Sequence, residues 1–143
     1  MKFIKLNDFC FYDFMIRDIS YKENTLTLDM PNTPYEDSLE DLKLEMTVDE
    51  DDLSIYYLKR YPRLHNVKLK GKEISFCTLK SFLEKGYALQ IEDFFVSANM
   101  NAVFLECEIF PYSAKRGVAK KIVFKLNYEH DYLILKQTTK VEK

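Results

Sequence analysis

Several stretches of the chain alternate apolar and polar residues, which is the pattern of β-strands that bury one face. The alternation is clearest at 42–48, where every second residue from Leu42 to Val48 is apolar and the residues between them are charged or polar. The same period of two appears at 25–30 and at 102–110. These three segments therefore predict strands.

Five further segments predict strands from their β-branched and aromatic residues and from partial alternation. They are 11–22, 49–62, 87–97, 118–127 and 131–137. Turn residues follow the first of them, so we expect it to form a hairpin with 25–30. Residues 49–62 also fit a short helix, with acids first, bases last and Pro62 at the end. We favour the strand, because the predicted strand at 42–48 needs a partner.

One segment has helical spacing. Ser75 can cap its start, and Gly86 lies where a left-handed C-terminal cap is expected. Its apolar residues on one face are Phe76, Leu79, Phe82 and Leu83. The elements together predict an α+β fold that is mostly β: an antiparallel sheet or two-layer β-sandwich of about seven or eight strands, with one short helix at about 75–85. No linker-like stretch interrupts the chain, so residues 1–143 are expected to form a single globular domain.

Two of the predicted strands share a sequence pattern, "MIRDISY" at 15–21 and "QIEDFFV" at 90–96. In each, the apolar positions shift phase by one residue, which a β-bulge would accommodate. Asp18 and Asp93 lie beside the shift, where a carboxylate can accept hydrogen bonds from unpaired backbone N–H groups. We therefore expect two bulged strands with locally bonded Asp residues, and a duplicated bulged hairpin is a hypothesis. The alternative places Asp18 and Asp93 in one cleft of a small-ligand-binding or hydrolytic domain.

The net charge is only −2, but residues 36–52 hold nine acids against Lys43. A dense carboxylate face steers a protein toward a basic partner, and inhibitors of nucleases, including immunity proteins and nucleic-acid mimics, use this principle. The acids predicted to contact a protein partner are Glu36, Asp37, Glu40, Asp41, Asp49, Glu50, Asp51 and Asp52. A competing prediction is nucleic-acid binding through 58–72, where bases interleave with Tyr61 and His65. The near-neutral total charge argues against this alternative and against an anionic membrane.

No pattern for catalysis or metal binding stands out, since the chain has two histidines, no Cys-x-x-Cys and no His-Glu-x-x-His. Cys77 opens the predicted helix, but its apolar neighbours predict a buried, inert thiol, and Cys10 and Cys107 are predicted to be small core residues. We expect no enzymatic activity, cofactor or metal. Three isolated cysteines, no signal-peptide pattern and no apolar run near the roughly 20 residues of a membrane helix predict a cytoplasmic protein.

The opening hairpin, "FCFYDFMIRDISYKENTLTLDM" at 9–30, resembles the start of several small uncharacterised bacterial proteins, some of which are similar to immunity proteins of polymorphic toxin systems. The resemblance implies a small cytoplasmic β-rich domain that binds one protein partner, and it transfers no site residue. Together with the acidic segment, it predicts a non-enzymatic, immunity- or inhibitor-like protein-binding module.

Overall fold

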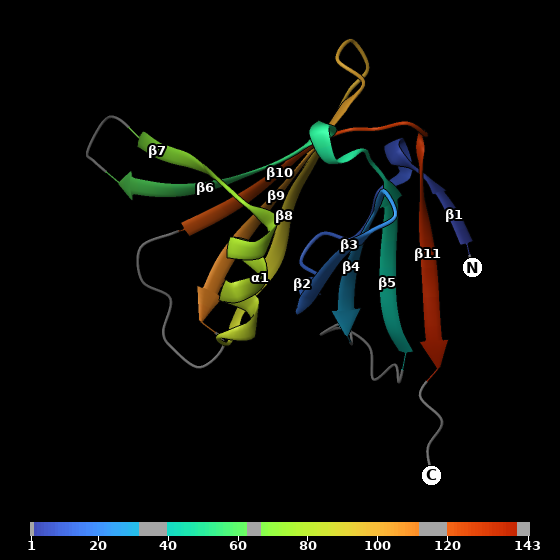
Figure 1. The fold of residues 1–143 in the computed structure, drawn as a ribbon, viewed down its shortest axis with the longest axis horizontal. Coiled ribbons are helices and arrows are strands. Elements are labelled where there is room, and N and C mark those ends of the chain that lie inside the picture. The colour runs from blue at the N-terminus through green and yellow to red at the C-terminus, as the bar shows by residue number, and fades with distance from the viewer. Residues whose placement is uncertain (1, 32–39, 63–66, 112–119, 140–143) are drawn as a thin grey trace.

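The computed structural model describes residues 2–31, 40–62, 67–111 and 120–139, which form two antiparallel sheets and one α-helix (Figure 1). The sheet of five strands has the order β1 (Lys2–Lys5), β11 (Tyr132–Thr139), β5 (Glu40–Thr47), β4 (Thr25–Pro31) and β3 (Asp18–Lys22). The sheet of six has the order β2 (Met15–Ile16), β8 (Tyr87–Ser97), β9 (Ala102–Pro111), β10 (Lys120–Asn127), β6 (Leu53–Pro62) and β7 (Val67–Ile74). Within these described residues, both sheets are open.

Each sheet turns one face toward a shared hydrophobic core, which explains the alternation in the sequence. The buried residues of β4, β5, β9 and β10 include Leu26, Leu28, Leu44, Met46, Leu105, Ile122 and Phe124. Each such side chain stabilises the fold by about 1.5–3 kcal/mol relative to an exposed one. Among the described residues no polar or charged side chain is buried, so the core is uniformly apolar.

The predicted helix is confirmed as α1 (Phe76–Glu84). The Ser75 hydroxyl accepts a hydrogen bond from a backbone N–H of the first turn, and Gly86 has a φ of +94° just beyond the helix. Leu79 and Leu83 are buried beneath it. The amphipathic spacing thus places one stripe of the helix on the core, as expected from the sequence.

All eight predicted strand segments contain strands, including 49–62, where β6 follows the 3-10 turn η2 (Glu50–Asp52). The reason for preferring a strand there was wrong, however. The partners of β5 are β4 and β11, whereas β6 pairs with β10 and β7 in the other sheet. The pattern identified the strand but not its neighbours, because period two is the same in either sheet.

The prediction of about seven or eight strands is wrong, since the described residues form eleven. Two strands, β1 and β7, were not predicted. The sequence of β7, "VKLKGKEI", is rich in lysine, and its strand is formed by pairing with β6. The third additional strand arises because 11–22 is divided.

The division of 11–22 corrects the first of the two predicted bulges. Met15 and Ile16 pair with β8, the chain then passes through Arg17, and Asp18 begins a strand paired with β4 in the other sheet. Residues 11–14 before them form no strand, and Asp13 has a φ of +69°. The phase shift therefore marks a strand that changes sheets. The second bulge is confirmed, because the β8–β9 register shifts between Ile91 and Asp93.

Candidate functional site

The described part of the acidic segment, residues 40–52, does not form one continuous face. Its middle is β5, which has eight residues, so at about 3.4 Å per residue its two ends lie about 25 Å apart. Asp41 belongs to the first end and Asp49 to the second. Inside β5, Glu45 forms a 2.7 Å ion pair with Lys136. The structure therefore separates Glu40 and Asp41 from the predicted partner-binding acids at 49–52.

Side chains are described for only one of these groups, the acids at 49–52. Glu36 and Asp37 lie outside the described residues, and Glu40 and Asp41 are described as backbone alone. The other group consists of Asp49, Glu50, Asp51 and Asp52, and all four side chains are exposed.

Hydrogen bonds hold this second group in a defined turn. The Asp49 carboxylate accepts a 2.9 Å bond from the Glu50 N–H, and the Asp52 N–H donates to the Asp49 carbonyl at 2.9 Å. Just before the turn, the Val48 N–H donates to the Asn24 carbonyl in the β3–β4 hairpin. The carboxylates thus project from a fixed turn rather than from a free loop.

Tyr21 shows which other acid belongs to this region. Its hydroxyl donates a 2.6 Å hydrogen bond to the Val48 carbonyl, directly behind the turn. Its pKa is raised above the usual value by desolvation, and further by carboxylates at Asp49, Glu50, Glu129 and Asp51. We call the exposed residues Asp49, Glu50, Asp51, Asp52 and Glu129 the acidic end.

Sequence reasoning missed Glu129, because that residue precedes β11 and lies far along the chain from η2. The only signal was the sequence Glu-His-Asp at 129–131, which follows the predicted strand at 118–127, and nothing in it indicated its neighbour in space.

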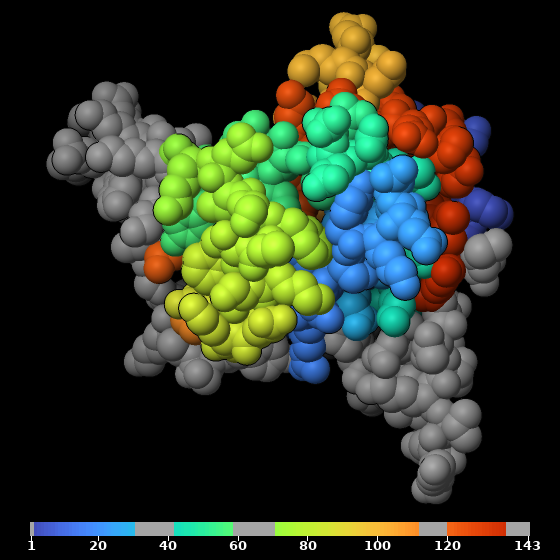
Figure 2. Space-filling model, viewed as in Figure 1, coloured from blue at the N-terminus to red at the C-terminus, as the bar shows by residue number. Residues whose placement is uncertain are grey.

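A turn with an exposed apolar side chain adjoins the acidic end. The Asn127 amide donates to the Met100 carbonyl at 3.1 Å, and the Tyr128 N–H donates to the Asn101 carbonyl at 3.0 Å. These bonds join the β8–β9 turn to the loop that carries Glu129. Met100 is 53% exposed. Figures 1 and 2 show this turn and η2 at the same end of the molecule.

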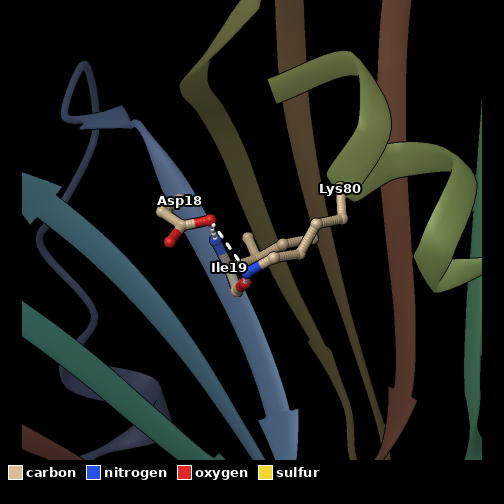
Figure 3. A network of polar contacts seen from close by, with 3 residues as sticks. All are labelled: Asp18, Ile19 and Lys80. Atoms are coloured by element: carbon tan, nitrogen blue, oxygen red, sulfur yellow. Dashed lines mark hydrogen bonds and ion pairs between the residues drawn. The ribbon is translucent and has the colours of Figure 1, made fainter. Parts of the chain in front are cut away.

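Asp18 makes the local bond predicted for it. Its carboxylate accepts a 2.9 Å bond from the Ile19 N–H and a 3.1 Å bond from Lys80 of α1 (Figure 3). Lys80 also donates to the Ile19 carbonyl at 2.7 Å. The N–H and the carbonyl of Ile19 are therefore both bonded to side chains. Ile19 lies in β3, an edge of the five-stranded sheet with which only β4 pairs among the described strands.

The same prediction is wrong for Asp93, whose exposed side chain makes no hydrogen bond or ion pair with the described residues. The extra residue of the bulge, Glu92, makes a side-chain ion pair instead of a bond to the backbone. It forms a 2.7 Å ion pair with Lys121, which also contacts Glu106 at 2.5 Å. Partial burial lowers the pKa of Lys121, but bonds to Glu106 and Glu92 outweigh this, so the pKa is raised.

The structure does not bring Asp18 and Asp93 together. Ile16 pairs with Leu89, and the stretch of β8 from Leu89 to Asp93 alone spans about 13 Å at about 3.3 Å per residue. From Ile16 the chain runs toward Asp18 in the opposite direction, because β2 and β8 are antiparallel. The two carboxylates therefore share no cleft.

The basic segment 58–72 forms β6, β7 and the residues between them. Its predicted contribution to nucleic-acid binding rests on side chains at 59–70, which lie outside the described side chains. Of its bases, only Lys72 has a described side chain, and it is exposed.

The cysteine predictions hold in one case of three. Cys107 is buried, and burial raises its thiol pKa. Cys10 and Cys77 are exposed, which corrects the prediction that both are buried. Cys10 lies in the irregular segment before β2 rather than in a strand, and Cys77 occupies the helix face opposite the buried Leu79 and Leu83.

A cavity of about 20 Å³ lies between the two sheets. Its lining is Phe9, Leu26, Leu28, Leu44, Met46, Phe94, Leu105, Leu126 and Leu133. Ligand pockets span roughly 300–1,000 Å³ and carry placed polar groups. This space is therefore a packing defect of the core.

Among the described residues, no group of three or more His, Cys, Asp or Glu side chains is arranged to hold a metal ion. Within the same residues, no helix is long and apolar enough to cross a membrane.

A scan against protein-family models, a search of curated proteins and a search of solved structures each found no match to this chain.

Proposed function

We propose that this chain is a non-enzymatic protein-binding module that docks a basic surface of one partner protein on the acidic end. One observation carries the proposal: the β6–β10 register pairs Leu53, directly after η2, with Leu126, so that η2 lies beside the loop that carries Glu129. Carboxylates of both segments raise the pKa of the nearby Tyr21 hydroxyl. Acids from two segments that the fold holds together concentrate negative potential at one fixed place on the surface. A run of acids in a flexible loop would spread that potential over many positions.

The physical consequences suit a partner-binding surface. The five acids are exposed, so they keep their hydration until a partner arrives, and they attract a basic surface over about one Debye length, roughly 8 Å at physiological salt. The hydrogen bonds of the turn limit the ordering that binding would require. Met100 adds an apolar contact beside the charges, and protein interfaces combine such contacts with a polar rim.

The finer descriptions of the protein belong to the same proposal. The resemblance at 9–30 and the acidic end together support an immunity- or inhibitor-like role. Free cysteines at positions 10, 77 and 107 are compatible with a reducing, cytoplasmic setting. We also infer that the two sheets are the layers of an open β-sandwich, since both line the cavity in the core.

The two alternatives have less support. A ligand-binding or hydrolytic site at Asp18 and Asp93 would need the two carboxylates in one cleft, and the strand register runs against this. Nucleic-acid binding through 58–72 has no contact among the described side chains that favours it.

Charge reversal tests the proposal. The variant carries Asp51→Lys, Asp52→Lys and Glu129→Lys, and it keeps Asp49 because that side chain caps the turn. A matched control reverses three exposed acids elsewhere, Glu73, Glu84 and Asp93. Proteins from the source cell captured by immobilised wild type and by each variant are identified by mass spectrometry, after circular dichroism melts show that both variants fold.

We expect a captured protein that is retained by the control variant, lost with the acidic-end variant, and released from the wild type as salt rises from about 0.05 to 0.5 M. Equal capture by the wild type and the acidic-end variant would contradict the proposal.

A further inference from the structure

The bulge in β8 places two consecutive acids on one face of the six-stranded sheet. In a regular strand, neighbouring residues point to opposite faces. Glu92 forms an ion pair with Lys121, which also contacts Glu106, and Asp93 stands opposite Glu106 in the β8–β9 register. Glu106 alternates along β9 with buried residues of the core. All three acids therefore lie on the face of the sheet that is turned away from the core.

The three carboxylates have one ammonium group among them. Lys121 bonds one oxygen of Glu92 at 2.7 Å and one oxygen of Glu106 at 2.5 Å. Asp93 is exposed and makes no hydrogen bond or ion pair with the described residues. The next outward-facing cation of β10, Lys125, stands opposite Phe104 rather than opposite an acid. The described cations of this face therefore leave the negative charge of Asp93 unpaired.

Two phenylalanines border these acids. Phe95 and Phe104 are cross-strand partners, and they lie two residues along their strands from Asp93 and Glu106. Directly opposed residues have Cβ atoms about 4.5–5.5 Å apart, and residues two positions along a strand are roughly 7 Å apart. Phe95 is 52% exposed, and Phe104 is half-buried. An exposed ring thus stands within one side chain's length of an unpaired carboxylate.

The helix packs on the other face of the sheet. Phe82 of α1 stacks on Tyr57 with ring centroids 6.0 Å apart, and Tyr57 pairs with the buried Ile122. Helix α1 therefore covers the core side of the sheet, where Figure 1 shows it in front of β8 and β9. This position leaves the outward side of β8 accessible, in agreement with the exposure of Asp93 and Phe95.

An arginine side chain fits this combination of groups better than a lysine side chain. The planar guanidinium stacks on an aromatic ring and donates paired hydrogen bonds to a carboxylate, whereas a lysine ammonium is a compact, strongly hydrated point charge. Lys121 already occupies the point-charge position between Glu92 and Glu106. The remaining acceptor, Asp93, has an exposed ring as its neighbour on the same face of β8.

We propose that the outward face of β8 and β9 binds an arginine side chain of a partner protein, with its guanidinium bonded to Asp93 and stacked on Phe95. Glu92 and Glu106, which Lys121 holds in place, add negative potential beside the bound cation. The inference uses none of the residues of the acidic end, so it stands or falls separately from the proposed function.

Three otherwise identical glycine–serine peptides test the proposal; they carry two arginines, two lysines or two citrullines, the last being a neutral analogue of arginine. Each is titrated into the isotope-labelled full chain at about 50 mM salt, where surface charges are weakly screened, and NMR shifts of the amides report each surface separately. We expect the arginine peptide to shift the amides around Asp93 and Phe95. It should bind there about threefold more tightly than the lysine peptide, and the citrulline peptide should leave these amides unchanged.

Two variants and a matched control locate the binding. Asp93→Asn and Phe95→Leu should each weaken the arginine peptide at this face by about threefold. Glu84→Gln, which changes an exposed acid on α1, should leave its affinity unaltered. The replaced side chains are all exposed, so we expect the variants to fold, which circular dichroism melts check.

Three results would overturn the proposal. Equal affinity of the arginine and lysine peptides at Asp93, or unchanged affinity in both variants, would indicate plain charge attraction. Peptide shifts confined to the acidic end would remove this face as a binding surface while leaving the proposed function intact. Shifts around Asp93 and Phe95 that depend on protein concentration without any peptide would identify a second copy of the chain as the occupant.

Discussion

The segments 15–21 and 90–96 have a similar order of apolar and acidic residues, yet their backbones depart from regular pairing in different ways. In the first, the chain leaves the sheet of six after Ile16 and joins the sheet of five at Asp18. In the second, β8 stays in one sheet and takes up an extra residue between Ile91 and Asp93. Both arrangements bury the apolar residue before the irregularity completely. A phase shift therefore predicts an irregularity without specifying its kind.

The polar contacts around the two irregularities also differ. At the sheet change, Asp18 bonds the next backbone N–H and Lys80, so the acid helps to close an edge. At the bulge, the extra residue Glu92 reaches a cation, and Asp93 projects into solvent. Because a bulge places two residues of one strand opposite one of its partner, either of them can carry the contact. Asp18 and Asp93 thus occupy the same place in the two sequence patterns but have different roles in the structure.

The largest expected effects come from the apolar residues that both irregularities keep buried. Ile16→Ala and Ile91→Ala should each lower the free energy of unfolding by about 2–5 kcal/mol, because both side chains are fully buried and leave a cavity. Urea denaturation followed by circular dichroism measures this. Phe95→Ala, in the second segment but 52% exposed, is the control and should cost less than about 1 kcal/mol. If Ile16→Ala behaved like the control, the sheet change would not be part of the packed core.

An intermediate effect is expected at the bulge. Lys121→Met removes the cation between Glu92 and Glu106 and leaves two partly buried carboxylates without it. We expect a loss of about 1–2 kcal/mol at neutral pH, reduced because 33% of the Glu92 side chain and 27% of the Glu106 side chain are exposed. The same substitution at Lys125, on the same strand and without a described ion pair, is the control. Equal losses for the two variants would mean that the ion pairs do not stabilise the bulge.

The pH dependence sharpens this prediction. The pKa of Lys121 is raised in the folded state, so its contribution is fully present below the unfolded value of about 10.4. The contribution is lost as the pH rises through the folded value. The difference in unfolding free energy between wild type and Lys121→Met should therefore be constant from about pH 7 to 9 and shrink above about pH 10.5. A difference that grew with pH would have the wrong sign for this cation.

The sequence predicted those parts of the fold that depend on local burial. Alternation located the strand segments, and the spacing of Leu79 and Leu83 with Ser75 and Gly86 located the helix. Sheet membership was not predictable, since a buried face has the same period in either sheet. β7 was missed although apolar residues at 67 and 69 alternate with lysines in its sequence, which is the period of a strand.

The candidate site was also predictable only where it depends on residues that are neighbours in the sequence. The acids of η2 stand out as a run in the sequence, but Glu129 joins them only through the fold. Glu40 and Asp41, adjacent in that run, lie at the far end of β5. A contiguous acidic stretch that contains a strand is divided by the length of that strand, about 25 Å here.

The smallest effects separate the two aspartates themselves. Asp18→Ala should lower the free energy of unfolding by about 0.5–1 kcal/mol, because its bonds are largely exposed, and should speed exchange of the Ile19 amide. Lys80→Met should reproduce part of this loss, and the double variant should cost less than the sum, because the two side chains act on one edge. Asp93→Ala should change neither stability nor exchange measurably, since its carboxylate has no described partner. Equal effects of Asp18→Ala and Asp93→Ala on stability and exchange would contradict this difference between the two aspartates. They would require a contact for Asp93 that the described residues do not show.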